Sequence, residues 1–547
     1  MNLRLLARLL ALVAMLIGGS MVFSLPWALP RAGGNWQHEQ RGFFALLASM
    51  IICFAVAGLL RRLGRNGSGK LFRKEAMAVV GLSWILATVL GGLPYLLSGT
   101  QRAAGVTMTP VDAMFEAQSG FSTTGATVLT DLENDVQVPR CILFWRSSTH
   151  FLGGLGIIVL FVAILGQGSA GKALMRAEMP GPSYSSTQAR TQHTAWVLFF
   201  LYAALNVALT VALMLEGLGL FDALCHAFGT MATGGFSTCN ASIGHFTTDP
   251  QLNGPLIEMT IVVFMVLAGT NFMLMYFVLI GQPKRMLLDV EWRAYVGILV
   301  VAAVLVTAIG LYCGDFDDFG TSDRPVDPAL TPETAQRAPL PPDAPSPLGR
   351  GIRFGLFQVV SIMTTTGFCT DDFDRYNSFA RGALLALMFV GGCAGSTGGG
   401  LKVVRHLLFF KSLRLEIERA FHPSVVRTLR LGGEPVPDQN LRNDVLVYFG
   451  LVMAIFVAGW LFTVTFEPDG TWTDYGHQSE HKLIDAASCV AATLNNIGPG
   501  LGVIGATKNY ANFTWPSKLL FIWLMMLGRL EIFVILVLFV PGFWRSQ

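Results

Sequence analysis

Long apolar segments recur along the whole 547-residue sequence, and each is about as long as an α-helix that crosses a lipid bilayer. Hydrophobic residues make up 52% of the chain and charged residues only 13%, well below the roughly 25% of soluble domains. Mean hydropathy is +0.54. We therefore predict an integral membrane protein. The expected spans are residues 5–29, 42–60, 76–98, 141–165, 195–215, 255–281, 294–313, 380–410, 443–465 and 518–541.

The positions of Lys and Arg predict the orientation of these spans, because cytoplasmic loops carry an excess of both. The first segment follows Arg4 and Arg8 as a signal peptide would, but no small-residue cleavage site comes after it. We interpret it as a first transmembrane helix. With the N-terminus inside, about 23 of the 38 Lys and Arg residues fall in cytoplasmic stretches and about 13 in outer ones. Both termini are therefore expected in the cytoplasm.

Net charge and cysteine usage exclude two other kinds of function. The formal net charge is +3, which is too small to indicate a nucleic-acid partner. None of the eight cysteines forms a CxxC pair, and most lie in apolar segments. We expect them to be small core residues rather than disulfide partners or metal ligands.

An internal repeat organises the chain. Four segments, near residues 110–122, 220–232, 352–364 and 484–495, are too short to span, and each ends in a piece rich in Thr, Gly or Asn. In three of them an aspartate, namely Asp112, Asp222 or Asp485, precedes a glycine by 13 residues. The other copy has Phe354 where the aspartate would be. We expect these aspartates to be N-caps of short helices, with direct contact to an ion as the alternative.

The repeat predicts an all-α membrane protein. Four units of helix, re-entrant pore helix, polar loop and helix would surround a central ion path, since irregular backbone at membrane depth must be buried or line a watery cavity. The predicted divisions are 1–74 for two additional N-terminal helices and 75–192, 193–292, 293–440 and 441–547 for the four pore repeats. The Pro/Asp-rich tract 314–350 in the third repeat is expected to be an extended outer loop, either a plain insertion or an acidic cation collector.

The four polar loops carry the candidate binding residues, and none of them contains a carboxylate, histidine or thiol. Carbonyls arranged in a ring can replace the hydration shell of a monovalent cation, and glycine permits the backbone angles that aim them inward. The C-terminal ends of the short helices would favour a cation at the same point. The alternative is close helix packing through small residues. The predicted filter residues are Thr123, Thr124, Gly125, Thr233, Gly234, Gly235, Thr365, Thr366, Gly367, Asn496, Ile497 and Gly498.

Two features below these loops are candidates for a gate. The stretch GGCAGSTGGGLK over 391–402 should break its helix, because each glycine costs about 1 kcal/mol relative to alanine. A static kink is the alternative, and the position of Lys402 does not fit a phosphate-binding loop. Arg529 lies inside an apolar helix, where a charge is usually functional. We interpret it as a barrier to cations, with a buried ion pair to Glu531 or another carboxylate as the alternative. The predicted gate residues are Gly391, Gly392, Gly395, Gly398, Gly399, Gly400 and Arg529.

Seven sequence motifs resemble those of one transporter superfamily. They are SGFSTTGAT, FWRSSTHFLGGLGI, TMATGGFST, MTTTGF, GGCAGSTGGGLK, NNIGPG and MLGRLE. Together they resemble the Trk/Ktr/HKT superfamily of potassium transporters, and most closely its bacterial Trk-type members, over nearly the whole chain. The resemblance implies potassium as the transported ion, no covalent cofactor, a bacterial inner membrane with its lipid, a homodimer, and a cytosolic ring of nucleotide-binding regulatory subunits. It also implies that the glycine loop moves when the pore opens.

The resemblance favours potassium over sodium. In plant relatives a serine in place of the first-loop glycine goes with sodium transport, whereas this chain has Gly125 there. The fourth loop departs from the pattern at Asn496 and Ile497. Alternatives are a sodium or mixed-cation transporter, an ammonium carrier, and a membrane sensor that has lost transport. We expect no enzyme, because GLGVIG at 500–505 follows no strand. The basic stretch 402–442 is a candidate docking surface for a regulatory partner.

Overall fold

The computed structural model describes residues 1–29, 36–65, 72–154, 156, 191–316, 346–422, 430–431, 434–435, 439–474, 479–530 and 532–545. Four predicted features fall wholly or partly outside them. These are most of the Pro/Asp-rich tract 314–350, the second half of the span 141–165, part of the basic stretch 402–442, and Glu531. What is described is mainly helical, with two short antiparallel hairpins.

The elements follow the predicted order of two leading helices and four similar units, where η marks a 3-10 helix. The leading elements are α1 (Leu3–Ser20), η1 (Met21–Ala28) and α2 (Trp36–Leu63). The first unit holds α3 (Arg73–Leu97), β1 (Gln101–Ala103), β2 (Val106–Thr107), α4 (Pro110–Phe121) and α5 (Arg140–Gly154). The second holds α8 (Thr191–Leu215), α9 (Leu220–Met231), η2 (Ser242–Gly244), α10 (His245–Thr248), α11 (Gly254–Ala268), α12 (Phe272–Leu279) and α13 (Pro283–Leu287).

The third and fourth units contain the same sequence of elements with additions. The third holds α14 (Val290–Cys313), α15 (Pro347–Met363), η3 (Phe373–Arg375), α16 (Ser378–Leu387), α17 (Val403–Phe421), β3 (Arg430–Leu431) and β4 (Glu434–Pro435). The fourth holds α18 (Gln439–Phe466), α19 (Gly470–Asp474), η4 (Ser479–His481), α20 (Lys482–Leu494), η5 (Gly502–Ile504), α21 (Trp515–Arg529), α22 (Ile532–Leu536), η6 (Val537–Phe539) and α23 (Pro541–Trp544). The GLGVIG stretch thus lies around η5, after the fourth loop.

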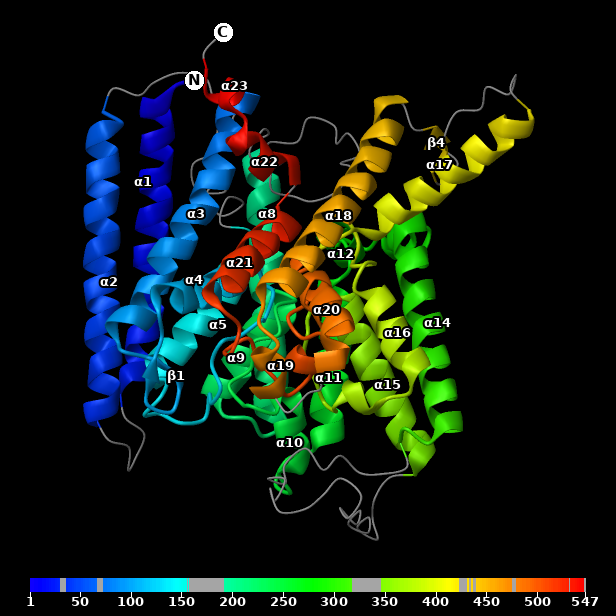
Figure 1. Cartoon of the computed structure of the whole chain (residues 1–547), viewed down its shortest axis with the longest axis horizontal. Coiled ribbons are helices and arrows are strands. Elements are labelled where there is room, and N and C mark those ends of the chain that lie inside the picture. Colours follow the sequence, from blue (N-terminus) through cyan, green and yellow to red (C-terminus); the bar gives the residue numbers. More distant parts are fainter. Residues whose placement is uncertain are drawn as a thin grey trace.

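The four units are arranged in a ring. Each short helix packs between two other helices of its own unit: α4 between α3 and α5, α9 between α8 and α11, α15 between α14 and α16, and α20 between α18 and α21. Contacts between units follow the chain, from α5 to α9 and from α11 to α15. A contact of α21 with α4 then joins the fourth unit to the first (Figure 1). Helices α1 and α2 pack on each other and on α3, at one edge of the ring.

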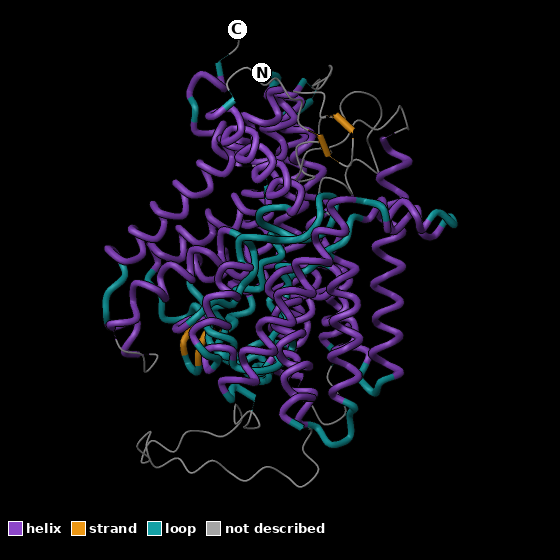
Figure 2. Tube along the Cα trace, turned by 90° about the vertical axis from the view of Figure 1, so that its right-hand side faces the viewer, coloured by secondary structure: helices purple, strands orange, loops and turns teal. Residues whose placement is uncertain are grey.

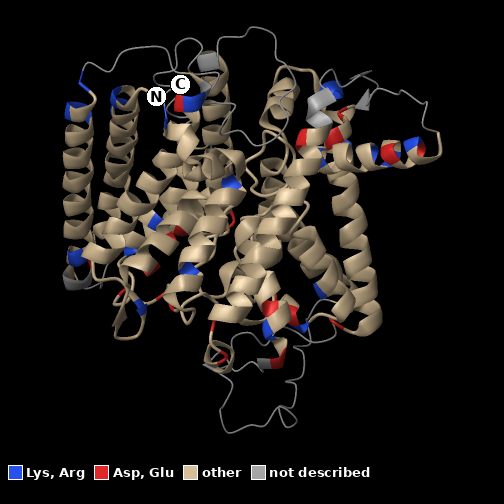
Figure 3. Cartoon of the chain, turned by 45° about the horizontal axis from the view of Figure 1, so that its top comes forward, with Lys and Arg blue, Asp and Glu red and all other residues tan. Residues whose placement is uncertain are grey.

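The outer surface of the ring is apolar. Side chains exposed on the outer helices include Phe200, Val207 and Val211 of α8, Val300 and Val304 of α14, and Leu461 of α18. Lys, Arg, Asp and Glu gather towards the two ends of the bundle (Figure 3), and both termini lie at the same end (Figure 1). An apolar belt between charged ends is what a bilayer requires of a surface that faces lipid.

Six of the ten predicted spans are unbroken helices that are long and apolar enough to cross a bilayer, within the described residues. They correspond to 5–29, 42–60, 76–98, 195–215, 294–313 and 443–465. The predicted span 141–165 is described as a helix only to Gly154.

The remaining three predicted spans are interrupted. The interruption of 380–410, between α16 and α17, is the one that the glycine run predicts. The predictions that 255–281 and 518–541 are continuous are wrong. α11 and α12 meet at a bend of 103°, where the side chain of Asn271 caps α12. α21 ends at Arg529. Figure 2 shows the consequence, which is that loop segments run through the middle of the bundle.

Candidate functional site

Each of the four short helices ends in the same backbone motif. The amide of Thr124 donates to the carbonyl of Ser119 at 2.9 Å, and that of Thr123 donates to Gly120 at 3.1 Å. Corresponding pairs of bonds end α9, α15 and α20. This is the Schellman motif, which requires a left-handed residue after the helix. The left-handed residues are Thr123, Thr233, Thr365 and Asn496, with φ between 52° and 61°.

These left-handed positions are strained, because glycine is the residue that usually occupies them. A non-glycine residue there costs roughly 1–3 kcal/mol, and such strain concentrates at functional sites. Asparagine tolerates the conformation better than threonine. The fourth loop therefore departs from the other three in composition while it keeps their backbone shape.

Two residues further on, each loop has a glycine that is also left-handed. Gly125, Gly235, Gly367 and Gly498 have φ between 74° and 94°. A Cβ atom added to any of the four would lie within 3.0 Å of a carbonyl oxygen of the neighbouring loop. The space beside each glycine is therefore occupied by backbone that only a residue without a side chain can approach.

The identity of these neighbouring oxygens places the loops in a closed ring. Gly125 faces the oxygen of Gly234, Gly235 that of Thr366, Gly367 that of Ile497, and Gly498 that of Thr124. The first loop therefore faces the second, the second faces the third, the third faces the fourth, and the fourth faces the first. The structure thus brings all four predicted loops together, with equivalent carbonyl groups from each. A ring of four equivalent carbonyl groups can supply oxygen ligands to a cation without a full charge.

A cavity of about 100 Å³ opens above the ring. The left-handed glycines of all four loops line it, together with Arg146 and residues of the outer loops. The left-handed glycines can therefore be reached from this cavity.

A buried ion pair and its hydrogen bonds hold the first loop in place. Arg146 of α5 lies 2.6 Å from Glu116 of α4, and it also donates to the carbonyl of Ser237 at 2.9 Å. Glu116 in turn accepts from Thr127 Oγ1 at 2.9 Å and from the amide of Val128 at 3.0 Å. Both charged side chains are almost fully buried. These hydrogen bonds hold Thr127 and Val128, which follow the first loop, against α4 of the same unit.

His150 links the first loop to the second. Its Nδ1 lies 2.9 Å from the carbonyl oxygen of Gly120, and its Nε2 accepts from the amide of Phe236 at 3.1 Å. These contacts give His150 a structural role between the two loops.

The predicted aspartate caps need a correction. The N-cap residues are Thr109, Gly219 and His481, so Asp112, Asp222 and Asp485 lie three or four positions inside their helices. Asp112 does take part in capping, because it forms a capping box with Thr109. Asp222 accepts from Thr238 Oγ1 at 2.7 Å, and Asp485 accepts from Trp472 Nε1 at 3.1 Å. All three carboxylates therefore bind protein groups at the helix ends remote from the ring.

Asp112 also forms a buried ion pair with Lys518 of the fourth unit, at 2.6 Å. Breaking this pair in Asp112→Asn leaves a buried ammonium, and we expect a loss of about 3–5 kcal/mol of stability. Thermal unfolding in detergent measures the change. The exposed pair of Arg419 and Glu416 is the control, because Glu416→Gln should cost less than about 1 kcal/mol. Equal melting temperatures for Asp112→Asn and Glu416→Gln would contradict this view of the pair.

The glycine loop 391–402 fills the break between α11 and α12. The amide of Cys393 donates to the carbonyl of Gly269 at 2.9 Å, and the amide of Phe272 donates to Gly395 at 3.0 Å. The loop thereby satisfies backbone groups that the 103° bend leaves unpaired. Three of its six glycines are left-handed: Gly391, Gly395 and Gly400.

The same glycine loop also contacts the loops and helix ends of the predicted filter. The amide of Gly399 donates to Thr365 Oγ1 at 2.9 Å, and a Cβ atom at Gly399 would lie within 3.0 Å of Asn496. Thr397 Oγ1 donates to the carbonyl of Met231, at the end of α9, at 2.9 Å. The loop is therefore in contact with the second, third and fourth units where their short helices end.

Arg529 joins this loop to the first unit. Its guanidinium donates to the carbonyl of Thr397 in the loop, to Gly153 at 2.6 Å and to Gly154 at 2.9 Å. The side chain is 7% exposed. The alternative partner Glu531 lies outside the described residues. Arg529 and the glycine loop, predicted separately as gate elements, thus form one assembly.

Glu291, in the first turn of α14, holds the glycine loop and the start of α17. Its Oε1 accepts from the amide of Ala394 at 2.7 Å and from that of Val404 at 3.1 Å. Glu291→Ala removes both bonds and should raise basal ion flux severalfold by freeing the loop. Flux into proteoliposomes measures this. Glu291→Gln keeps an acceptor oxygen and serves as the control. Equal flux in the Ala variant and the wild type would refute the view that Glu291 holds the glycine loop closed.

Sequence reasoning missed three of these features. The left-handed conformation at the Thr positions had one signal, the Asn496 that aligns with them. Glu291 and Lys518 gave none, because their partners lie more than 100 residues away in the chain.

Comparison with known proteins points to one family. The family model TrkH, described as "Cation transport protein", matches residues 43–546. "Trk system potassium uptake protein TrkH" of Salmonella typhimurium is 35% identical over 549 residues, covering 100% of both chains. The protein of the same name from Halomonas elongata is 34% identical over 552 residues, again with full coverage. "Trk system potassium uptake protein TrkG" of Escherichia coli is 30% identical over 93% of both chains.

A solved structure extends the likeness to three dimensions. The crystal structure of the potassium transporter TrkH from Vibrio parahaemolyticus superposes with a TM-score of 0.78 at 31% identity, and the match covers 100% of both chains. The TrkH relatives and the solved structure match the full length of the sequence, and the family model matches nearly all of it. The described chain is a multi-pass membrane protein with the predicted architecture. The chain belongs to the TrkH family of cation transport proteins.

Proposed function

We propose that this protein takes up potassium across the inner membrane of a bacterium, along the axis that the four loops enclose. The observation that carries the proposal is the closed ring in which each filter glycine faces the carbonyl of the next loop. Carbonyl ligands without a full charge suit a weakly held monovalent cation. The relatives are named potassium uptake proteins, which supports potassium as the ion.

The filter comprises the twelve predicted residues of the four loops, and the gate comprises the glycine loop with Arg529. Buried Thr123 Oγ1 and Asn496 Oδ1 have no hydrogen-bond partner among the described residues, which supports water or ions near the lower side of the ring. Arg529 would oppose cations by its charge and hold the loop by its hydrogen bonds. Transport, rather than catalysis, is what the family description supports.

The assembly that we propose is a homodimer bound to a cytosolic nucleotide-binding regulatory subunit. The words "Trk system" in the names of the relatives support further components. The charged helix α17, which projects from the bundle in Figure 1, forms most of the described part of the predicted docking stretch 402–442. We place both termini and this helix on the cytoplasmic side, in keeping with the distribution of Lys and Arg.

Ion flux into proteoliposomes tests the proposal. Purified protein is reconstituted, and uptake of rubidium or potassium is compared with uptake of sodium under equal gradients. We expect potassium and rubidium to enter at least about tenfold faster than sodium, since glycine occupies the key position in all four loops. Equal rates for sodium and potassium would replace potassium uptake by mixed-cation transport. Absence of flux with and without the regulatory partner would refute transport.

A further inference from the structure

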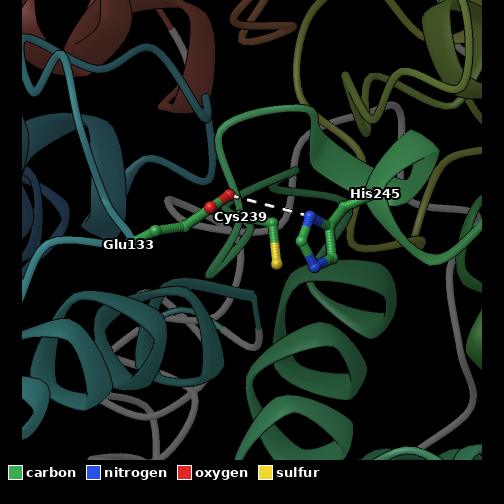
Figure 4. A group of neighbouring side chains, drawn as sticks. All are labelled: Glu133, Cys239 and His245. Atoms are coloured by element: carbon green, nitrogen blue, oxygen red, sulfur yellow. Dashed lines mark ion pairs between the residues drawn. The ribbon is translucent and has the colours of Figure 1, made fainter. Parts of the chain in front are cut away.

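Two outer loops bring three unlike metal-ligating side chains together beside the cavity. Glu133 follows the first filter loop, whereas Cys239 and His245 follow the second. Their ligand atoms all lie within 4.8 Å of one another, and Glu133 Oε1 is 3.8 Å from His245 Nδ1 (Figure 4). In a tetrahedral zinc site, ligand atoms about 2.0–2.3 Å from the ion lie about 3.4–3.8 Å apart. Small side-chain rotations would therefore close the site around an ion.

The donor set favours a particular class of cation. Thiolate and imidazole ligands select zinc and related borderline-soft metals, whereas calcium and magnesium prefer an all-oxygen site. Three protein ligands also leave a fourth tetrahedral position for water. Glu133 and His245 are each 44% exposed at the side chain, so an ion can reach the cluster from solvent.

The scaffold of the cluster is held by hydrogen bonds that do not depend on an ion. The side-chain oxygen of Asn240 accepts from the backbone amide of Leu132 at 2.8 Å. The backbone amide of Asn240 donates to Glu133 Oε1 at 2.9 Å. The amide of Cys239 donates to Ser237 Oγ at 3.0 Å. These bonds join the two loops and fix the positions of Glu133 and Cys239, which is the support that a metal site requires of its surroundings.

We propose that Glu133, Cys239 and His245 bind a zinc-class divalent cation at the outer mouth of the pore, and that the bound ion lowers cation entry. Cys239 lines the same cavity as the filter glycines. Without metal the three side chains carry the single negative charge of Glu133. A divalent ion with a Cys239 thiolate brings the total to zero, and the mouth then attracts cations less strongly. The inhibitory part rests on the proposed transport function, whereas the binding part does not.

Metal binding must displace the thiol proton, which passes to bulk water. Burial raises the pKa of the Cys239 thiol to about 12, so the thiol is protonated at neutral pH without metal. A coordinated thiol is deprotonated by the ion itself.

Cobalt(II) provides a probe of binding that needs no transport. Titration into the purified full-length protein should produce one equivalent of the thiolate-to-cobalt charge-transfer band per chain. Cys239→Ser should abolish the band, and His245→Ala and Glu133→Gln should each weaken affinity at least about tenfold. The last two side chains are exposed and their replacement leaves the core intact. Cys313→Ser, at the exposed cysteine, is the control that should change nothing.

The result that would overturn the site is a band that persists in Cys239→Ser, one that disappears in Cys313→Ser, or no band in the wild type. Zinc added outside proteoliposomes should lower rubidium uptake at least about twofold in the wild type and not in His245→Ala. A normal cobalt band with zinc-insensitive uptake would overturn the inhibitory role. A normal band without any uptake would count against the proposed transport function and leave the metal site standing.

Discussion

Gly125→Ser is expected to lower the preference for potassium over sodium at least about tenfold, equivalent to about 1.4 kcal/mol. Gly125 has φ +80°, and a Cβ atom there would displace the carbonyl of Gly234. One moved oxygen changes the ligand geometry of the whole ring, because the four loops contact one another in sequence. Rubidium and sodium uptake into proteoliposomes, measured for the same preparation, gives the ratio.

Gly105→Ser provides a control for backbone strain. Gly105 has φ +74°, but a Cβ atom there meets nothing within 4 Å. Its replacement therefore imposes similar strain without crowding a neighbour, and we expect an unchanged selectivity ratio. If Gly125→Ser retains the wild-type ratio, or if Gly105→Ser loses it equally, the close approach of the loops does not determine selectivity.

Arg529→Ala is expected to raise basal cation flux about tenfold or more. Hydrogen bonds to a charged group contribute about 1.5–3 kcal/mol each, and Arg529 makes them to the glycine loop and to the end of α5. Their loss frees the loop from the first unit and also removes a positive charge below the ring. Flux in the absence of any partner protein measures the effect. Unchanged or lower flux in a correctly folded Arg529→Ala variant would contradict the gate.

Arg529→Lys separates the two roles of this side chain. Lysine keeps the charge but lacks the planar fork that joins carbonyls on two segments. If hydrogen bonding holds the gate closed, Arg529→Lys should conduct nearly as well as Arg529→Ala. If the charge alone repels cations, the Lys variant should stay close to the wild type. The contacts to Thr397, Gly153 and Gly154 favour the first result.

Much of the fold could be predicted from the sequence because it depends on local signals that repeat. The apolar segments, the four short helices and the glycine run each follow from composition over a few residues. Six of the ten spans, the four short helices and the glycine run appear at the predicted positions in the described residues. The bend at Asn271 was not predictable in the same way. It is stabilised by the glycine loop, whose residues Cys393 and Gly395 are distant in sequence. Continuous apolar sequence therefore does not guarantee a continuous helix.

The candidate site, like the fold, could be predicted where it depends on local sequence and not where it depends on tertiary contacts. The twelve loop residues could be selected from residue type and spacing, yet the order of the ring depends on approaches such as Gly498 to Thr124, across nearly the whole chain. The aspartates were assigned to the correct helix ends but to the wrong position, because the N-cap of α4 is Thr109 and Asp112 supports it. Pairing of Asp112 with Lys518 is a tertiary contact that no local pattern encodes.

The position of a bound rubidium ion tests the central claim most directly. Rubidium resembles potassium in size and scatters X-rays anomalously, so diffraction from crystals soaked in rubidium locates it without reference to flux. We predict an anomalous peak on the axis of the ring, ligated by the carbonyls of Thr124, Gly234, Thr366 and Ile497. A well-occupied peak elsewhere in the protein with none at the ring would contradict the account.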